Sequence, residues 1–91
     1  MARILVIEDN PVNLELLVDL LEAWGHRTLV ATDGDEGLAV VRRERPALVI
    51  CDLQMPGRDG YSVAAAIRAD PVLRHLPLIA VTAFAMVGDR E

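Results

Sequence analysis

The chain has 91 residues, of which 53% are hydrophobic, so it can form one small domain with a core and is too apolar to be disordered. Its net charge of −5 argues against a nucleic-acid-binding surface. No apolar run approaches the length of a membrane span, and no signal peptide is evident. The single cysteine, Cys51, excludes an internal disulfide and fits a reducing compartment. We therefore expect a cytoplasmic protein without membrane or nucleic-acid partners.

Short apolar runs alternate with helix signals along the chain. Residues 4–7 form an apolar run that predicts a buried strand. Asn10 followed by Pro11 is typical of a helix start, and Gly25 is typical of a helix end near Trp24. The other elements are predicted at residues 27–31 (strand), 33–45 (helix), 47–51 (strand), 61–69 (helix) and 78–81 (strand), with the start of a further helix at 86–91.

This alternation of strands and helices predicts an α/β fold with a parallel sheet, right-handed crossovers and helices on both faces. Ligands of such open sheets bind beyond the carboxyl ends of the strands. Three predicted strands end in polar residues, because Glu8 and Asp9 follow the first, Asp52 follows the third and Thr82 follows the fourth. The sequence therefore places three carboxylates and a hydroxyl at one edge of the sheet.

Several carboxylates at one edge repel each other unless a cation joins them, and Mg²⁺ prefers such oxygen ligands. An aspartate beside Mg²⁺ can attack a phosphoryl group, which makes Asp52 the candidate nucleophile and Thr82 a candidate hydrogen-bond donor. Taken singly, Asp9 could instead cap the following helix, and Asp52 could be an ordinary loop acid. Asp59 is expected to be a turn or cap residue before Gly60 rather than a metal ligand. The combination of acids at successive strand ends favours a metal-dependent phosphoryl site.

The polar residues at the strand ends and Asp59 lie within four longer motifs, which are Ile7-Glu8-Asp9-Asn10, Cys51-Asp52-Leu53-Gln54-Met55-Pro56-Gly57, Asp59-Gly60 and Val81-Thr82-Ala83-Phe84-Ala85-Met86. With these motifs the chain resembles a response-regulator receiver domain, most closely the stand-alone cell-cycle receivers and the receivers of hybrid sensor kinases. The resemblance covers the whole chain. It implies a doubly wound, flavodoxin-like sheet of order 2-1-3-4-5.

The resemblance also implies a function for each site residue. Asp52 would accept a phosphoryl group from a histidine kinase or a histidine phosphotransfer protein. Asp9, Asp52 and the backbone carbonyl of Gln54 would ligate Mg²⁺, with Glu8 acting through water. Thr82 would be the switch hydroxyl. The chain would then be a regulatory phosphoacceptor rather than an enzyme.

The chain departs from the family at its C-terminal end. Receivers carry a lysine and a switch aromatic on a fifth strand, whereas all nine basic residues here are arginine. Residues 1–91 are therefore expected to be an incomplete receiver domain of strand order 2-1-3-4, without strand 5 and helix 5. The edge of the fourth strand would then be unpaired, which predicts that the fragment self-associates.

The first predicted helix carries two apolar stripes on nearly opposite sides. One stripe must face the sheet, and the other is either a docking surface for the partner or buried beneath a further helix. In the family, this helix docks on the partner's helical bundle, which assigns partner contacts to Val12, Leu16 and Leu20. The two stripes comprise Leu14, Leu17, Val18 and Leu21 on one side, and Val12, Leu16, Leu20 and Ala23 on the other.

Two other functions compete with a phosphoryl-accepting module. A Mg²⁺-dependent phosphohydrolase could form an aspartyl phosphate, but the dehalogenase-like members carry a second aspartate two residues after the nucleophile, where this chain has Gln54. A receiver used as a non-phosphorylated interaction scaffold is the other alternative. The presence of Glu8, Asp9, Asp52 and Thr82 argues against this alternative for the parent protein, but it stays open for the fragment itself.

Overall fold

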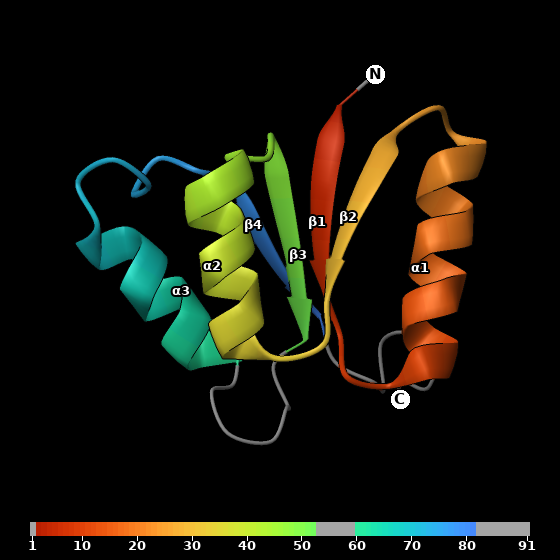
Figure 1. The fold of residues 1–91 in the computed structure, drawn as a ribbon, viewed down its shortest axis with the longest axis horizontal. Coiled ribbons are helices and arrows are strands. Elements are labelled where there is room, and N and C mark those ends of the chain that lie inside the picture. The colour runs from red at the N-terminus through yellow and green to blue at the C-terminus, as the bar shows by residue number, and fades with distance from the viewer. Residues whose placement is uncertain (1, 53–59, 82–91) are drawn as a thin grey trace, which may run out of the picture.

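The computed structural model describes residues 2–52 and 60–81, which form a four-stranded parallel sheet flanked by three helices (Figure 1). The strand order β2-β1-β3-β4 confirms the predicted doubly wound arrangement. The elements are β1 (Arg3–Ile7), α1 (Pro11–Ala23), β2 (Arg27–Ala31), α2 (Gly34–Glu44), β3 (Leu48–Asp52), α3 (Gly60–Ala69) and β4 (Leu78–Val81).

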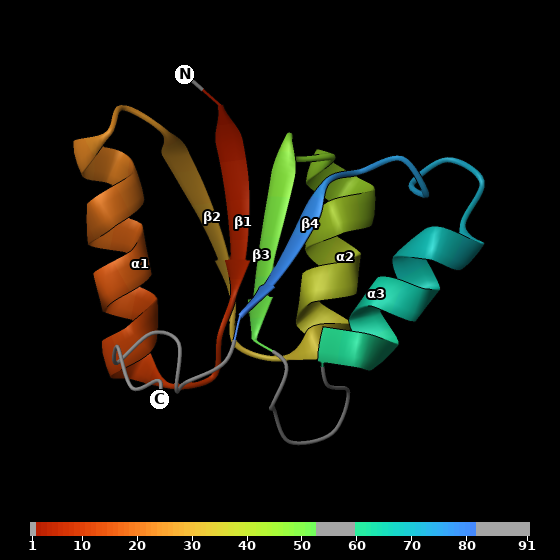
Figure 2. The same ribbon diagram turned by 180° about the vertical axis from the view of Figure 1, so that it is seen from behind.

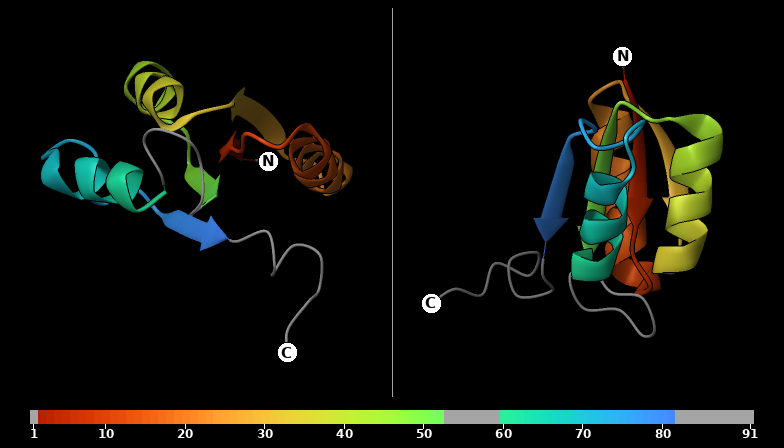
Figure 3. Two further views of the ribbon diagram at one scale, coloured as in Figure 1. Left: turned by 90° about the horizontal axis from the view of Figure 1, so that it is seen from below. Right: turned by 90° about the vertical axis from the view of Figure 1, so that its left-hand side faces the viewer.

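Helix α1 covers one face of the sheet, and α2 and α3 cover the other (Figures 2 and 3). Each face has its own apolar core, because successive residues of the two central strands point to opposite sides. Burial on both faces explains why β1 and β3 are short, nearly continuous apolar runs. The core under α1 contains Ile4, Val6, Leu21 and Ile50, and the core under α2 and α3 contains Leu5, Ile7, Leu38, Val41, Val49, Cys51, Val63 and Ile67.

The helix ends follow local capping chemistry. The Asn10 side chain accepts hydrogen bonds from the first-turn N–H groups of α1, as predicted. Gly25, just beyond α1, has a φ of +90°, which glycine adopts at little cost. Asp33 caps α2 by accepting a hydrogen bond from Glu36 N–H at 2.8 Å. Arg45 ends that helix in the left-handed conformation, at φ 47°.

The predicted boundaries agree with the structure to within about one residue, with one useful difference. Strand β3 begins at Leu48 and includes Asp52, so the acid is the last residue of the strand and not the first of the loop. Its backbone is therefore fixed by the sheet, since Asp52 pairs with Val81 of β4. The helix predicted at 86–91 lies outside the described residues. Among the described residues, no helix combines the length and apolarity that a membrane span needs.

Candidate metal and phosphoryl site

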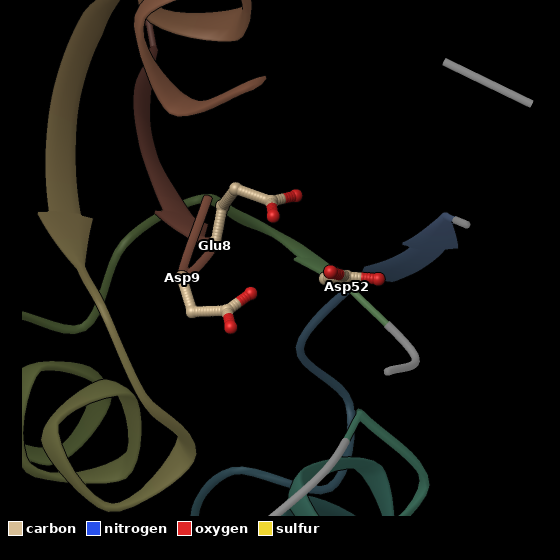
Figure 4. Close-up of side chains that lie close together, drawn as sticks. All are labelled: Glu8, Asp9 and Asp52. Atoms are coloured by element: carbon tan, nitrogen blue, oxygen red, sulfur yellow. The ribbon is translucent and has the colours of Figure 1, made fainter. Parts of the chain in front are cut away.

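Three acidic side chains meet at the carboxyl edge of the sheet (Figure 4). Glu8 and Asp9 follow β1, and Asp52 ends the neighbouring strand β3. One carboxylate oxygen from each of the three lies within 4.8 Å of the other two. The sequence prediction that these acids converge is therefore confirmed.

The sheet register explains why the acids converge. Ile7 of β1 stands beside Cys51 of β3, so the next residue of each strand, Glu8 and Asp52, reaches the same edge. Glu8 N–H also donates a 3.0 Å hydrogen bond to the Ala31 carbonyl, which holds the chain against β2 after β1 ends. The site is thus built on sheet backbone, which positions side chains more accurately than a loop does.

The helix that follows β1 does not need Asp9 as a cap. Asn10 Oδ1 accepts hydrogen bonds from Val12 N–H at 2.9 Å and Asn13 N–H at 3.1 Å. Since Asn10 is the N-cap of α1, Asp9 is not needed to cap this helix. Asp9 is exposed and its carboxylate faces the cluster, at the open side of the site (Figure 4).

Glu8 is buried to an extent that would be energetically costly for a charged carboxylate without a partner. Only 2% of its surface is exposed, and Asp52 beside it is 4% exposed. Glu8 Oε2 accepts a 3.2 Å hydrogen bond from Asn10 N–H, whereas the buried Oε1 has no hydrogen-bond partner within the described part of the chain. Burying an unsatisfied charged oxygen is costly, so this geometry fits an oxygen that a bound cation, or a proton shared with Asp52, would stabilise.

Burial raises the pKa of Glu8 to about 7. The Asn10 N–H opposes this rise, and the neighbouring carboxylates Asp52 and Asp9 add to it. A carboxyl group whose pKa is raised this far from 4.5, mainly by burial and further by two nearby carboxylates, is typical of a functional site.

The donor set fits a hard divalent cation. Three carboxylates with converging oxygens supply the ligand chemistry that Mg²⁺ prefers, and the cation would offset the carboxylate repulsion that adds to the rise in the Glu8 pKa. Asp9, Asp52 and Glu8 are the described residues that would hold it. Gln54 and Thr82, which the sequence assigned to the same site, lie outside the described residues, as does Asp59.

Helix α1 presents the two stripes that its sequence predicts. Leu21 is buried against the sheet with Leu14 and Leu17 packed beside it, whereas Val12, Leu16 and Leu20 are 70%, 56% and 45% exposed. The structure extends this exposed stripe to Trp24, which is 67% exposed and follows the same spacing of four residues. The prediction had ended the stripe at Ala23, although the spacing of 12, 16 and 20 points to 24. The exposed stripe is hereafter Val12, Leu16, Leu20 and Trp24.

The fold and the acid cluster define an open α/β domain with carboxylates gathered at the carboxyl edge of its sheet. The model of the response regulator receiver domain matches residues 4–91. The chain is 44% identical over 88 residues to the polar-differentiation response regulator DivK of Brucella anthropi. The aligned region covers 97% of this chain and 72% of DivK.

Solved structures agree with the sequence comparison. The N-terminal domain of a response regulator receiver protein from Methanoculleus marisnigri superposes with a TM-score of 0.88 at 34% identity, covering 91% of this chain and 68% of that one. The receiver domain of a signal transduction histidine kinase from Syntrophus aciditrophicus gives 0.87 at 35% identity, covering 90% and 62%. The chain belongs to the response-regulator receiver family of two-component signalling, as its motifs had indicated, and that family is regulatory.

Proposed function

We propose that Asp52 accepts a phosphoryl group from a phosphohistidine of a histidine kinase or histidine phosphotransfer protein. The observation that carries this proposal is the convergence of Glu8, Asp9 and Asp52 at one edge, with their ligand oxygens within 4.8 Å. Family membership makes a phosphoacceptor the expected chemistry of such a cluster. The chain would act as a regulatory phosphoacceptor in the cytoplasm and not as an enzyme with a separate substrate.

Mg²⁺ is the proposed cofactor, held by Asp9, Asp52 and the Gln54 backbone carbonyl, with Glu8 acting through water. When bound, it would neutralise charge on the phosphoryl oxygens. Support comes from a structural neighbour, the Mn²⁺-bound form of the response regulator Rcp1, which has a TM-score of 0.82 and 27% identity over 90% of this chain. The buried Glu8 oxygen without a hydrogen-bond partner among the described residues supports the same assignment.

In the transfer step, an Asp52 carboxylate oxygen forms a bond to phosphorus as the bond from phosphorus to the donor imidazole nitrogen breaks. The electron pair of the broken bond stays on that nitrogen. Thr82 is proposed to donate a hydrogen bond to a phosphoryl oxygen of the product. A phosphorylated neighbour supports the product, since the phosphorylated response regulator RcpA superposes with a TM-score of 0.81 and 31% identity over 89% of this chain.

The exposed stripe of α1 is proposed as the surface that meets the phosphoryl donor. Val12 and Leu16 lie nearest the acid cluster along the helix, because α1 begins at Pro11, just beyond Glu8 and Asp9. Exposed apolar side chains at spacing i, i+4 fit the groove of a helical partner. A donor docked there would bring its histidine to the carboxyl edge, where Asp52 lies.

Phosphotransfer from a phosphorylated histidine phosphotransfer domain, followed by intact-mass spectrometry in Mg²⁺ and in EDTA, tests the proposal. The parent chain should gain one phosphoryl group in Mg²⁺ and none in EDTA. Asp52→Asn should abolish the gain, whereas Asp35→Asn, an equal change of charge in the first turn of α2, should leave it in place. Persistent labelling of Asp52→Asn would overturn Asp52 as the acceptor.

A further inference from the structure

Positive charge is gathered at the end of the domain opposite the acid cluster. All seven arginines of the described residues lie at starts of strands, at the C-terminal ends of α2 and α3, or in the loop before β4. Three acids, Glu22, Glu44 and Asp70, lie at the same end, so the end is net positive in a chain whose total charge is −5. The arginines are Arg3, Arg27, Arg42, Arg43, Arg45, Arg68 and Arg74.

Some of this charge is used within the domain. Arg3 and Arg43 both pair with Glu44 at 3.1 Å. Arg68 donates hydrogen bonds to the carbonyls of Arg74 and Leu76. Arginines in the last turn of a helix also complement the helix dipole, which is reason enough for Arg42 and Arg43 to be there. These contacts do not account for Arg45.

Arg45 holds an unusual backbone conformation for its side chain. Its φ of 47° and ψ of 65° are left-handed, and it is the one non-glycine residue among those described with positive φ. Glycine or asparagine is the usual residue at such a position, since the left-handed conformation costs other residues about 1 kcal/mol of conformational free energy. The Arg45 guanidinium makes no ion pair or hydrogen bond with any described residue. A strained residue with an uncommitted charge is a reason to look for a ligand.

Arg45 and Arg42 line a pocket of about 130 Å³ between the end of α2 and the turn after α3. The other walls are Asp70, Val72 and Leu73. Asp70 is already engaged, because its Oδ1 accepts a 2.8 Å hydrogen bond from Val72 N–H and its Oδ2 lies 3.9 Å from Arg42 Nε. The remaining Arg42 N–H groups make no hydrogen bond within the described part of the chain. Both guanidinium groups therefore have hydrogen-bond donors available for a ligand.

The size and lining of this pocket define what fits it. Small-molecule sites usually measure about 300–1,000 Å³, so this pocket suits a single side chain rather than a whole ligand. Two arginine side chains favour a carboxylate, which they can hold with charge-assisted hydrogen bonds. Val72 is 64% exposed beside them and offers an apolar contact. The net negative charge of the chain disfavours a nucleic acid backbone as the source of the anion.

We propose that this pocket, lined by Arg42, Arg45 and Val72, is a recognition site for a carboxylate side chain that an acidic segment of a protein partner presents beside an apolar residue. The pocket lies at the opposite end of the strands from Glu8, Asp9 and Asp52. A partner could therefore hold the domain there while a phosphoryl donor uses the carboxyl edge.

Titration of the ¹⁵N-labelled chain with the blocked dipeptide acetyl-leucyl-glutamyl-amide, followed by two-dimensional NMR, tests the proposal. Amide signals of the α2 end and of residues 70–73 should shift and saturate. The neutral analogue with glutamine should leave them unchanged. Inorganic phosphate is titrated in parallel, and shifts with phosphate but none with the dipeptide would overturn the proposal.

Arg45→Gly separates recognition from folding. This variant removes the guanidinium and also relieves the left-handed strain, so its melting temperature should rise or stay equal while its affinity for the dipeptide falls about three- to tenfold. Arg43→Gln removes an arginine of the same helix end that does not line the pocket, and should bind the dipeptide as the parent does. Equal affinity in Arg45→Gly and the parent, or an equal loss in Arg43→Gln, would overturn the site.

Discussion

Glu8 and Asp52 occupy equivalent positions at the ends of neighbouring strands, one residue beyond the paired Ile7 and Cys51, and both residues are buried. This pairing concentrates two negative charges where water is largely excluded. Without a counter-ion, burial and the nearby carboxylates raise the pKa of Glu8 to about 7, so Glu8 holds a proton to a higher pH than an exposed glutamate does.

Removal of one carboxylate should weaken the binding of Mg²⁺. We expect Asp9→Asn to lower Mg²⁺ affinity by about tenfold or more, because it removes a charged oxygen ligand from a three-acid cluster. The increase in melting temperature with Mg²⁺ concentration measures this. Asp35→Asn, with the same loss of charge away from the cluster, is the matched control. Equal Mg²⁺ stabilisation of the parent and Asp9→Asn would contradict the assignment.

The stability of the metal-free chain should fall as pH rises from about 4.5 to about 7. The folded state holds a proton on Glu8 up to about pH 7, whereas the unfolded state releases it near 4.5. The folded state therefore binds more protons in this window, and its free energy of unfolding decreases with pH by up to about 3 kcal/mol. Urea unfolding in EDTA at several pH values measures the slope.

Glu8→Gln is the control for this pH dependence. It should flatten the slope and raise the stability of the metal-free chain at pH 8, because it removes a buried charge. Saturating Mg²⁺ should also remove the slope in the parent, since the cation replaces the proton. An unchanged slope in Glu8→Gln would show that another group titrates.

The acid cluster could be predicted from the sequence because the position of each acid depends only on where its strand ends. Apolar runs ending in acids identified the strand ends, and parallel strands bring these ends to one edge. The burial of the Glu8 Oε1 atom could not be predicted, because it depends on how elements distant in the sequence pack around the end of β1. The arginine-lined pocket was also missed, because its walls come from two elements about 25 residues apart and no periodicity joins Arg45 to Val72.

Gly37 should not tolerate a side chain. A Cβ there would lie 2.4 Å from Ile7 Cδ1 and 2.9 Å from Ile7 Cγ1, so α2 can approach β1 this closely because the residue is glycine. We expect Gly37→Ala to destabilise the fold by about 1–3 kcal/mol, although alanine is the better helix former. Urea unfolding measures the change.

A second substitution shows whether this contact is the cause. Ile7→Val removes Cδ1, and alone it should cost about 1 kcal/mol. Combined with Gly37→Ala, it should be less destabilising than the two separate effects added together. Simple additivity would mean that Gly37 matters for a reason other than contact with Ile7.

Leu16→Asp should distinguish docking from burial for the exposed stripe of α1. Leu16 is 56% exposed, so its substitution should change the free energy of unfolding by about 0.5 kcal/mol or less. Phosphotransfer from the donor should nevertheless slow by about tenfold, because a charge would enter an apolar interface. Stopped-flow transfer assays and urea unfolding measure the two effects. A lower stability with normal transfer would indicate burial beneath another segment.

Trp24 gives an independent measure of the same interface. It is the single tryptophan of the chain and is 67% exposed at the end of the stripe. Docking of a helical partner should bury it and shift its emission to shorter wavelength. Leu16→Asp should reduce this shift at a given partner concentration. An emission spectrum that does not respond to the donor would place docking elsewhere.

The open edge of β4 should cause the chain to self-associate. β4 pairs with β3 on one side, and among the described residues no strand pairs with its other side. Ile79 on this strand is 49% exposed, so an apolar side chain accompanies the unpaired backbone groups. Unpaired edges of this kind recruit strands from other molecules.

Light scattering should show a mass that rises with concentration, and Ile79→Lys should suppress the rise, because a charge at an edge opposes strand pairing. Val72→Lys, a similar change at an exposed valine outside the strand, should leave the association in place, and a monomer at all concentrations in the parent chain would contradict the prediction.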